Sequence, residues 1–350
     1  MKIVAEYIWL DINSNFRSKT KIFSLDEGEW WQLQSYPIWN YDGSSTGDIP
    51  ENKQHATECL LYPVAIYDDP FNINTDTRIH MLVFCKNSYI INDKETGVHP
   101  LMFNKLEEMN TILEKEGYQF GFEQEFFLIN PKTGRPFGIT EPLAITQGDY
   151  YCGVGCFNVE NRAFLADCQT KLLDAGIQLT GFNYEVAPSQ AEFQVCDYGL
   201  EACYQLLILR YILKRNGELH NIHVSYSNII YRSNNINNSG CHINISNHKM
   251  RTGDEEKYGA EYILDKINEL GDKTPGSKEE FNNIFGNGNV ERLTGELETS
   301  KWNHFDWGFG TRNTSIRIPI IVKKNNAGYF EDRRPGANID PFSYLNYLLF

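Results

Sequence analysis

Long apolar runs are missing from this sequence of 350 residues. No segment approaches the roughly 18–20 consecutive apolar residues of a membrane-spanning helix, since even the apolar stretch 206–213 contains Arg210. Near the start, only three apolar residues precede Glu6, too few for the apolar centre of a secretory signal. We therefore expect a cytoplasmic protein that has no membrane partner.

Proline, linkers and positive charge are also scarce. The 13 prolines, and the lack of any repeat or Pro/Gly/Ser-rich linker, exclude a disordered or tethered architecture. Without an export signal, the eight cysteines are expected to be reduced thiols, and the spacing of Cys152 and Cys156 is only weak support for zinc or redox chemistry. The 46 acidic and 32 basic residues give a formal charge of -14, which opposes a nucleic-acid partner.

Common nucleotide and zinc-protease motifs are absent. The sequence contains neither the GxGxxG motif of a dinucleotide-binding fold nor the HExxH motif of a zinc protease. Segment 271–278 resembles a phosphate loop only superficially, because its last two residues are Ser-Lys and no strand precedes it. Any nucleotide chemistry must therefore come from another arrangement of side chains.

The chain divides into two regions of different pattern. Residues 1–98 are mostly short β-branched or aromatic runs, with expected strands at 3–11, 18–23, 58–67 and 80–85 and a polar loop at 39–46. From residue 99 on, helices are expected at 100–116, 160–175, 200–215 and 255–269, ended by Gly117, Gly176, Gly217 and Gly271. Strands are expected between them at 120–129, 179–187, 191–196, 241–246, 315–321 and 328–333. This order predicts an α+β fold in which a mainly antiparallel sheet has helices on one face and a polar face opposite.

Polar side chains recur at positions i and i+2 of these strands, which places them on one face. They include Glu123 and Glu125, Glu185, Glu192 and Gln194, His242, Asn244 and Ser246, and Glu331 and Arg333. Any one pair is typical of an ordinary solvated strand face. Together, however, five carboxylates and one histidine would repel one another unless cations neutralised them, and this ligand set suits Mg²⁺ or Mn²⁺.

Arginines are concentrated in the last quarter of the chain. They are Arg292, Arg312, Arg317, Arg333 and Arg334. Divalent ions and arginines together commonly hold nucleotide phosphates and a phosphoryl group in transfer. The pattern therefore favours phosphate chemistry on the polar face of the sheet.

Eight ordered blocks resemble glutamine synthetase of the eukaryotic type over nearly the whole chain. The blocks are 39–46, 122–125, 148–155, 183–194, 240–244, 292–300, 315–319 and 328–335. The resemblance implies an ATP-dependent ligase that joins ammonia to the γ-carboxylate of L-glutamate through a γ-glutamyl phosphate. It also implies an N-terminal β-grasp-like domain at 1–98, a catalytic domain at 99–350, and a homo-oligomer, a decamer of two pentameric rings with active sites shared between subunits.

The resemblance also implies roles for individual residues. Each site would bind at least two divalent ions, Mg²⁺ or Mn²⁺, one held by Glu125, Glu185 and Glu192 and a second by Glu123, His242 and Glu331. ATP would contact Glu123, Glu192, Asn244, Ser246, Arg312, Arg317 and Tyr329, and glutamate would contact Asn235, Ile236, Arg292, Arg312 and Arg333. Catalytic roles fall to Asp42, which would come from a neighbouring subunit and help deprotonate ammonium, to Tyr151 near it, to Arg312, and to Glu298 on a closing flap.

Five positions depart from the pattern of that family. The family usually has Trp at Gln119, Gly at Asn238, His at Leu297, Asn at Thr311 and Arg at Ile320. Two alternative functions therefore stay open: a non-catalytic structural or regulatory relative, and a ligase that uses an amine in place of ammonia. All six predicted metal ligands are present, which favours the enzyme.

Overall fold

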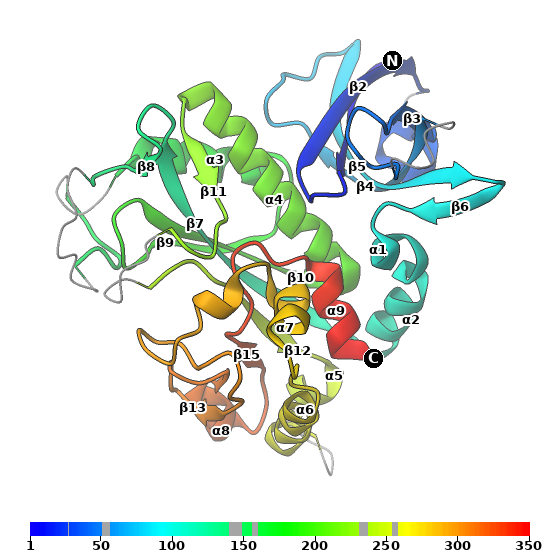
Figure 1. The fold of residues 1–350 in the computed structure, drawn as a ribbon. Helices are drawn as coiled ribbons and strands as arrows, with labels where there is room; N and C mark the ends of the chain where they lie inside the picture. The colour runs from blue at the N-terminus through cyan, green and yellow to red at the C-terminus, as the bar shows by residue number, and fades with distance from the viewer. Residues whose placement is uncertain (27, 51–56, 140–148, 156–159, 231–236, 254–257) are drawn as a thin grey trace. The chain divides into compact units, whose positions relative to one another are not determined.

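The computed structural model describes the chain except for residues 27, 51–56, 140–148, 156–159, 231–236 and 254–257 (Figure 1). It contains two compact units, each with its own sheet. Unit 1 comprises Met1–Met109 and Gln169–Ile177, and unit 2 comprises Asn110–Cys168 and Gln178–Phe350. The mixture of sheets and helices confirms the α+β fold class.

Unit 1 is built on a six-stranded sheet. Its strands are β1 (Lys2–Leu10), β2 (Phe16–Ser24), β3 (Trp39–Asp42), β4 (Glu58–Asp68), β5 (Arg78–Ile91) and β6 (Lys94–Gly97), and two short 3-10 helices cover Glu29–Trp31 and Leu33–Ser35. The order is β2-β1-β5-β4-β3, with β6 beside β5; β1 and β5 are parallel and the other pairs antiparallel. Alternate residues of β1, such as Ile3, Ala5 and Tyr7, enter the core.

Two sequence predictions in this part of the chain were wrong. Half of the predicted loop 39–46 is strand β3, because its aromatic residues pair with β4 and Tyr41 is buried. The single helix predicted at 100–116 is two helices, α1 (Pro100–Asn104) and α2 (Leu106–Glu116), separated at Lys105. Gly117, which follows α2 with a φ of 63°, ends the second helix as predicted.

Unit 2 is built on a nine-stranded sheet that carries most of the predicted site residues. Its strands are β7 (Gln119–Asn130), β8 (Arg135–Pro136), β9 (Leu179–Tyr184), β10 (Gln190–Tyr198), β11 (His223–Ser225), β12 (Cys241–Ser246), β13 (Trp307–Phe309), β14 (Ile316–Ile318) and β15 (Phe330–Asp332). The order is β13-β14-β15-β12-β7-β10-β9, with β8 and β11 beside β7. Among the described strands of this second sheet, only β13 and β14 pair in parallel, as expected of a mainly antiparallel sheet.

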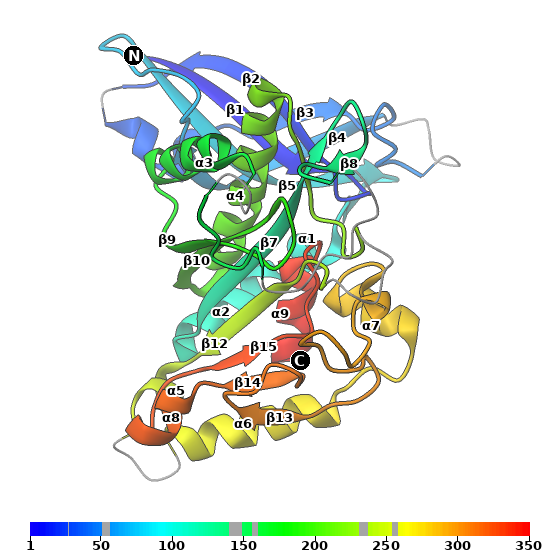
Figure 2. The ribbon, with the colours of Figure 1, turned by 90° about the vertical axis from the view of Figure 1, so that its left-hand side faces the viewer.

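The helices after α2 are α3 (Arg162–Asp174), α4 (Gly199–His220), α5 (His248–Arg251), α6 (Ala260–Asp272), α7 (Lys278–Phe285), α8 (Ile320–Asn325) and α9 (Pro341–Leu349), with a 3-10 turn at Asn289–Glu291. The long helix α4 packs on β7, β10 and β11 (Figures 1 and 2). Its buried Arg210 donates from Nε to Oε1 of Gln124 on β7, 2.7 Å away, which shows that Gln124 points toward α4. The neighbouring Glu123 and Glu125 therefore point to the opposite face.

Two glycines do not end their helices as predicted. Helix α4 continues through Gly217 to His220 and is capped by Asn221, which has a φ of 54°. Gly217 is needed for packing, because a Cβ there would collide with the carbonyl oxygen of Ile222. Helix α6 likewise continues through Gly271, where a Cβ would lie 2.9 Å from the ring of Phe305. The strand predicted at 315–321 is also shorter, since Pro319 precedes helix α8.

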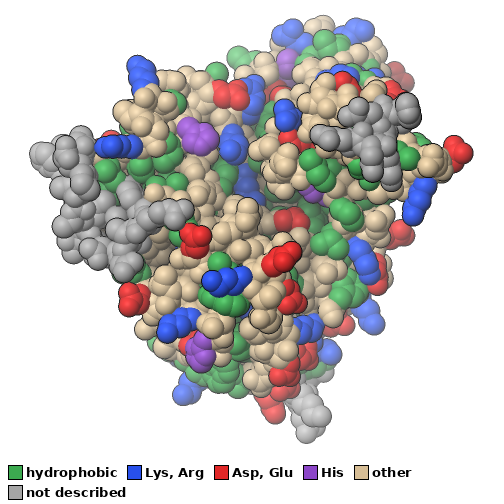
Figure 3. All heavy atoms as spheres, viewed as in Figure 1, with side chains coloured by type: hydrophobic (Ala, Val, Ile, Leu, Met, Phe, Trp, Pro, Cys, Tyr) green, Lys and Arg blue, Asp and Glu red, His purple; other side chains and the backbone are tan. Residues whose placement is uncertain are grey.

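On the face drawn in Figure 3, acidic and basic side chains are interspersed. Within the described part of the chain, no helix combines the length and the apolar character that crossing a bilayer demands.

Candidate active site

The predicted site residues form three rows across one face of the unit 2 sheet. The first row joins Asn183 on β9, Glu192 on β10 and Glu125 on β7. The second joins Gly181, Gln194, Glu123 and His242, and the third joins Gly121, Asn244, Glu331 and Arg317. Because antiparallel registers place directly opposed residues about 4.5–5.5 Å apart, residues distant in sequence become neighbours.

Two sets of three side chains on this face could each hold a metal ion. In one set, Glu125, Glu185 and Glu192 each offer an oxygen, and in the other Glu123, His242 and Glu331 each offer one atom. Within each set the offered atoms lie within 4.8 Å of one another. These are the same two triplets that the sequence resemblance implied.

The first set consists of three carboxylates crowded together away from solvent. Glu125 and Glu192 are buried, and burial raises the pKa of all three to about 8. Mutual repulsion adds to the rise, since Glu185 acts on Glu125, and Glu192 acts on Glu185. Three crowded carboxylates, two of them buried, destabilise one another's charge and form a site that a cation would neutralise.

The second set combines carboxylates with a neutral imidazole. The Nδ1 atom of His242 lies 3.6 Å from Glu123 and 3.5 Å from Glu331. Burial, and then the nearby Arg333, holds the pKa of His242 well below its usual value. A neutral imidazole can donate a lone pair to a metal, so oxygen ligands with one such nitrogen fit Mg²⁺ or Mn²⁺.

Glu331 is anchored by two arginines, Arg317 on β14 and Arg333 directly after β15. Its Oε1 accepts a hydrogen bond from Arg333 at 2.6 Å, and its Oε2 accepts one from Arg317 at 2.7 Å. Arg333 also donates to the backbone carbonyl of Arg312 and, at 3.3 Å, to that of Glu298. Arg333 therefore links the second carboxylate set to the loop that carries Glu298.

Three of the four predicted catalytic residues lie together in unit 2. Arg312 is 3.9 Å from the carboxylate of Glu298, and Arg312 and Tyr151 lie close enough that the charge of Arg312 acts on the pKa of Tyr151. Tyr151 and Arg312 both interact electrostatically with Glu185 of the first set. Arg312 and Glu298 are 47% and 40% exposed, so their charged groups remain accessible to a ligand.

The fourth predicted catalytic residue, Asp42, belongs to unit 1. It ends β3, is exposed, and accepts hydrogen bonds from the hydroxyls of Ser44 and Ser45. These two hydroxyls lower the pKa of Asp42, so the carboxylate is negatively charged at neutral pH. Asn235 and Ile236, predicted to contact glutamate, lie outside the described residues.

The remaining predicted ligand contacts surround the second set. Asn244 donates to Glu123 at 2.8 Å, and Tyr329 interacts electrostatically with Glu123. Ser246 lies farther along β12, opposite Gln119, and accepts a hydrogen bond from Arg251. Its hydroxyl is therefore partly engaged within the protein.

Two of the five arginines have a structural role. Arg292 is buried, and its side chain donates to Asn289 and to three carbonyl oxygens at 333–335. Burial lowers its pKa to about 10. Arg334 points away from the site, into the core, where it pairs with Asp332 at 2.6 Å. Arg334 was counted among the five arginines of the last quarter of the chain, but it does not share their face of the sheet, because it alternates with Arg333 along the extended chain.

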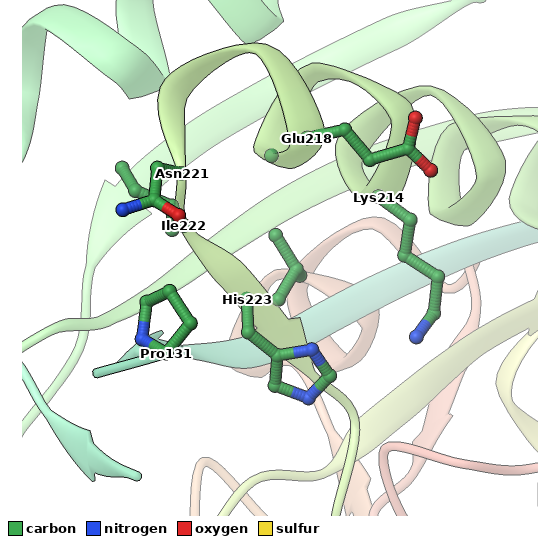
Figure 4. A pocket seen from close by; sticks show the side chains of 8 residues that line it. Pro131, Lys214, Glu218, Asn221, Ile222 and His223 are labelled. Atoms are coloured by element: carbon green, nitrogen blue, oxygen red, sulfur yellow. The ribbon is translucent and has the colours of Figure 1, made fainter. Parts of the chain in front are cut away.

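A separate hollow of about 350 Å³ lies at the end of α4 (Figure 4). Its lining includes Lys214, Glu218, Asn221 and His223. Burial lowers the pKa of both Lys214 and His223, and the charge of Lys214 also acts on His223. None of the described site residues lines the hollow, so it is distinct from the two carboxylate sets.

Comparison with known proteins agrees with this geometry. Residues 104–258 match the family described as glutamine synthetase, catalytic domain. The glutamine synthetase of Kluyveromyces lactis is 38% identical in an alignment that covers 97% of this chain and 86% of the yeast protein. The chain belongs to the glutamine synthetase family. The Saccharomyces cerevisiae enzyme is 36% identical over 97% of this chain and 86% of its own length. A protein of Acanthamoeba polyphaga mimivirus, provisionally named a glutamine synthetase, is 37% identical over 99% of this chain and 93% of its own length.

The structure accounts for two of the departures from the usual glutamine synthetase pattern. Asn238, where the family usually has Gly, is buried, and its side-chain oxygen accepts a hydrogen bond from the backbone N–H of Ile230. It does not have the positive φ that would require glycine. Gln119 instead contacts Cys196 through its side chain. Leu297 and Glu298 have φ values of 53° and 63°, so the segment around Glu298 contains two consecutive strained residues.

Sequence reasoning assigned no supporting role to several side chains next to the glutamine synthetase carboxylates. Gln190, Asn183 and Gln194 each hydrogen-bond to a carboxylate of the first set. The i, i+2 spacing from Glu185 and Glu192 could have identified Asn183 and Gln194. Gln190 follows a turn, so only its position in the folded chain shows the contact.

Proposed function

We propose that this protein is a glutamate–ammonia ligase that uses ATP and forms L-glutamine through γ-glutamyl phosphate. The observation that carries the proposal is the pair of metal-fitting triplets on one sheet face, beside Arg312, Glu298 and Tyr151. Membership of the glutamine synthetase family supports the same reaction.

Phosphorylation makes the γ-carboxylate of glutamate reactive. In the proposed first step, an oxygen of that carboxylate attacks the γ-phosphorus of ATP and ADP leaves. Bound Mg²⁺ or Mn²⁺ would neutralise the phosphate oxygens, and the residues that would hold the ions are the two triplets. Arg312, with an accessible guanidinium, would stabilise charge on the transferring phosphoryl group, and Arg317 and Tyr329 would contact the nucleotide.

The second step replaces phosphate by nitrogen. Ammonium has no lone pair, so it must be bound and lose a proton before it can attack the acyl carbon and release phosphate. Asp42, which the neighbouring hydroxyls keep ionised, would attract ammonium and accept its proton, with Tyr151 nearby in the assembled site. Glu298 would close over the acyl phosphate and exclude water.

Glutamate would be held by the positive side of the same face. Arg333 lies between Glu331 and the Glu298 loop, and Arg292 orders the backbone at 333–335. We propose that Arg292, Arg312 and Arg333 contact glutamate. Asn235 and Ile236 remain proposed contacts for the amino-acid end of glutamate.

The direct test is to measure phosphate and glutamine made by the purified protein from ATP, Mg²⁺ and glutamate, with and without ammonium. The proposal predicts equal amounts of phosphate and glutamine, formed only with ammonium. Turnover with methylamine but not ammonium would favour the amine ligase. No turnover with any of these, or with Mn²⁺, would support a non-catalytic relative.

We also propose that the active sites are shared between subunits of a decamer. Asp42 belongs to unit 1 and the two metal sets belong to unit 2, so each site can combine Asp42 of one subunit with the sheet of another. Mixed oligomers of Asp42→Ala and Arg312→Ala subunits should regain activity, because some interfaces would pair two intact halves. Mixtures that stay as inactive as the parent variants would contradict shared sites, and a mass other than ten chains would contradict the decamer.

A further inference from the structure

Carboxamide side chains accompany most of the carboxylates in the two metal-fitting triplets. Glu185 accepts a hydrogen bond from Asn183 at 2.7 Å, and Glu192 accepts one from Gln194 at 2.6 Å. Glu125 and Glu123 accept hydrogen bonds from Gln190 at 3.0 Å and Asn244 at 2.8 Å. Four of the five carboxylates thus each have a carboxamide donor, and the fifth, Glu331, is held by arginines.

The hydrogen bonds engage one particular oxygen of a carboxylate. Oε2 of Glu125 accepts from Gln190 and from the backbone N–H of Gly240, while Oε1 faces Nδ1 of His242 at 4.0 Å. In Glu123, Oε1 accepts from Asn244, and Oε2 faces the same nitrogen at 3.6 Å. In both residues the oxygen toward His242 is the one left for a metal ion.

A neutral hydrogen-bond donor is better suited than a cation to orient a carboxylate that binds a metal ion. An arginine beside a carboxylate neutralises much of the charge that attracts a metal ion. A carboxamide carries no net charge, so it fixes the orientation of the carboxylate and leaves that charge in place. Hydrogen bonds of this kind to metal-binding side chains commonly set both their orientation and the metal affinity.

The surrounding chain leaves space for these carboxamide side chains. Gln190 is buried, and its Oε1 accepts no hydrogen bond from the described residues. An unpaired buried oxygen costs free energy, and the fold keeps it together with the hydrogen bond from the Gln190 amide nitrogen to Glu125. Gln194 lies directly opposite Gly181, where a Cβ would collide with its Oε1. Asn244 lies opposite Gly121, where a Cβ would come within 3.3 Å of the Asn244 side chain.

We propose that the carboxamides of Asn183, Gln190, Gln194 and Asn244 are positioning residues for the two divalent ions. Each holds one oxygen of its carboxylate so that the other oxygen is presented to the ion. Gly181 and Gly121 contribute to this positioning, because they leave the space in which the side chains of Gln194 and Asn244 lie. The inference rests on the proposed function, since it assumes that the triplets bind metal.

The test is a calorimetric titration of the metal-free protein with Mn²⁺, for wild type, Gln194→Met and Asn244→Leu. These changes keep much of the side-chain size and remove the donor. We expect affinity at one site to fall on the order of 10–100-fold in each variant. The matched control is Gln205→Met, which removes a buried carboxamide that donates to Asp197 at 2.5 Å, outside both triplets. Unchanged Mn²⁺ affinity in both test variants, or an equal loss in the control, would overturn the inference.

A second variant tests the same role without altering any carboxamide. Gly181→Ala should displace Gln194 and weaken Mn²⁺ binding in the same direction as Gln194→Met. Gly276→Ala is the control, because a Cβ there meets no atom within 4 Å. If Gly181→Ala keeps its fold and binds Mn²⁺ as tightly as wild type, the position of Gln194 does not affect metal binding by Glu192.

Activity separates positioning from a general structural defect. A positioning role predicts a higher KM for Mn²⁺ and recovery of most of kcat at saturating Mn²⁺, whereas a defect unrelated to metal would lower kcat at every concentration. The two proposals fail differently. Wild-type protein that binds no Mn²⁺ would overturn the proposed function, whereas wild-type binding with equally tight binding by the variants would overturn only this inference.

Discussion

Strand β15 and the residues after it carry two kinds of arginine–carboxylate pair on opposite faces of the sheet. On one face, Glu331 is held by Arg333 and Arg317 and also lies 3.5 Å from His242. On the other, Asp332 accepts from Arg334 at 2.6 Å and from Tyr344 at 2.9 Å. Residues adjacent in sequence therefore enter two different environments.

The two faces differ in whether their charges are balanced. Aromatic rings surround Arg334, whose guanidinium lies over Phe285, Phe305 and Tyr347, and its charge is balanced by Asp332. On the opposite face, Glu331 is joined by four further carboxylates, and three of them have raised pKa values. A balanced buried pair supports the fold, whereas an excess of one charge on a sheet face indicates a ligand of the other charge.

The largest expected effect on stability comes from the balanced pair. Asp332→Asn leaves Arg334 charged and buried without its partner, so unfolding free energy should fall by about 3–5 kcal/mol. Urea denaturation of the metal-free protein measures this, with Glu192→Gln as the matched change on the other face. A loss below about 1 kcal/mol would remove the distinction between the two faces.

Metal ions should stabilise only through the unbalanced face. At a free Mn²⁺ concentration about 100 times the dissociation constant, each occupied site adds about 2.7 kcal/mol to the unfolding free energy. The gain should be smaller in Glu125→Gln, which loses a ligand of one triplet. Melting curves with EDTA and with Mn²⁺ provide the measurement, and an equal gain in both proteins would place the ions elsewhere.

Removing one crowded carboxylate should stabilise the metal-free protein. Glu192→Gln relieves repulsion within the first triplet and should raise the unfolding free energy at pH 8 by about 0.5–2 kcal/mol, although Mn²⁺ binding is weakened. Stability gained together with lost binding is the signature of a site that the fold maintains for a ligand. Destabilisation by this variant at pH 8 would contradict the crowding argument.

The stability difference between Glu192→Gln and wild type should depend on pH. The pKa of Glu192 is raised from 4.5 to about 8 in the folded protein, so the folded state binds more protons than the unfolded state between these values. Wild-type stability therefore falls as pH rises through that window, and the advantage of the variant should grow from about pH 5 to pH 8. Urea titrations at several pH values in EDTA measure it, and an advantage that shrinks with pH would have the wrong sign.

The smallest effect on stability is expected at the exposed edge of the site. Glu298→Ala removes a 40% exposed carboxylate, so the unfolding free energy should change by no more than about 0.5 kcal/mol. The reaction should nevertheless lose its coupling, with more phosphate released than glutamine formed, because water would reach the acyl phosphate. Phosphate and glutamine are assayed in the same sample, and continued equality would remove Glu298 from the flap.

Sequence patterns predicted the site strands because alternation fixes which side chains share a face. Glu123 and Glu125 needed only that rule, whereas their proximity to Glu192 and His242 depends on strand register, which the family resemblance supplied. Alternation alone also separates Arg333 from Arg334, which their shared place among the arginines of the last quarter of the chain does not show.

Local patterns failed where a distant contact decides the conformation. Glycine is typical of helix ends, which is why Gly217 and Gly271 were predicted to end their helices. Instead, each leaves space for another group, the carbonyl oxygen of Ile222 at Gly217 and the ring of Phe305 at Gly271. The buried hydrogen bond from Gln190 to Glu125 likewise joins two strands 65 residues apart. Such contacts become visible only when the register of the sheet is known.

The central claim is that the two triplets bind two divalent ions, and metal stoichiometry tests it most directly. Protein equilibrated with Mn²⁺ and dialysed at fixed free Mn²⁺ should contain two ions per chain by elemental analysis. Glu125→Gln and Glu331→Gln should each retain one, because each removes a ligand from a different triplet. Fewer than two ions in the wild type, or two ions in both variants, would contradict the account.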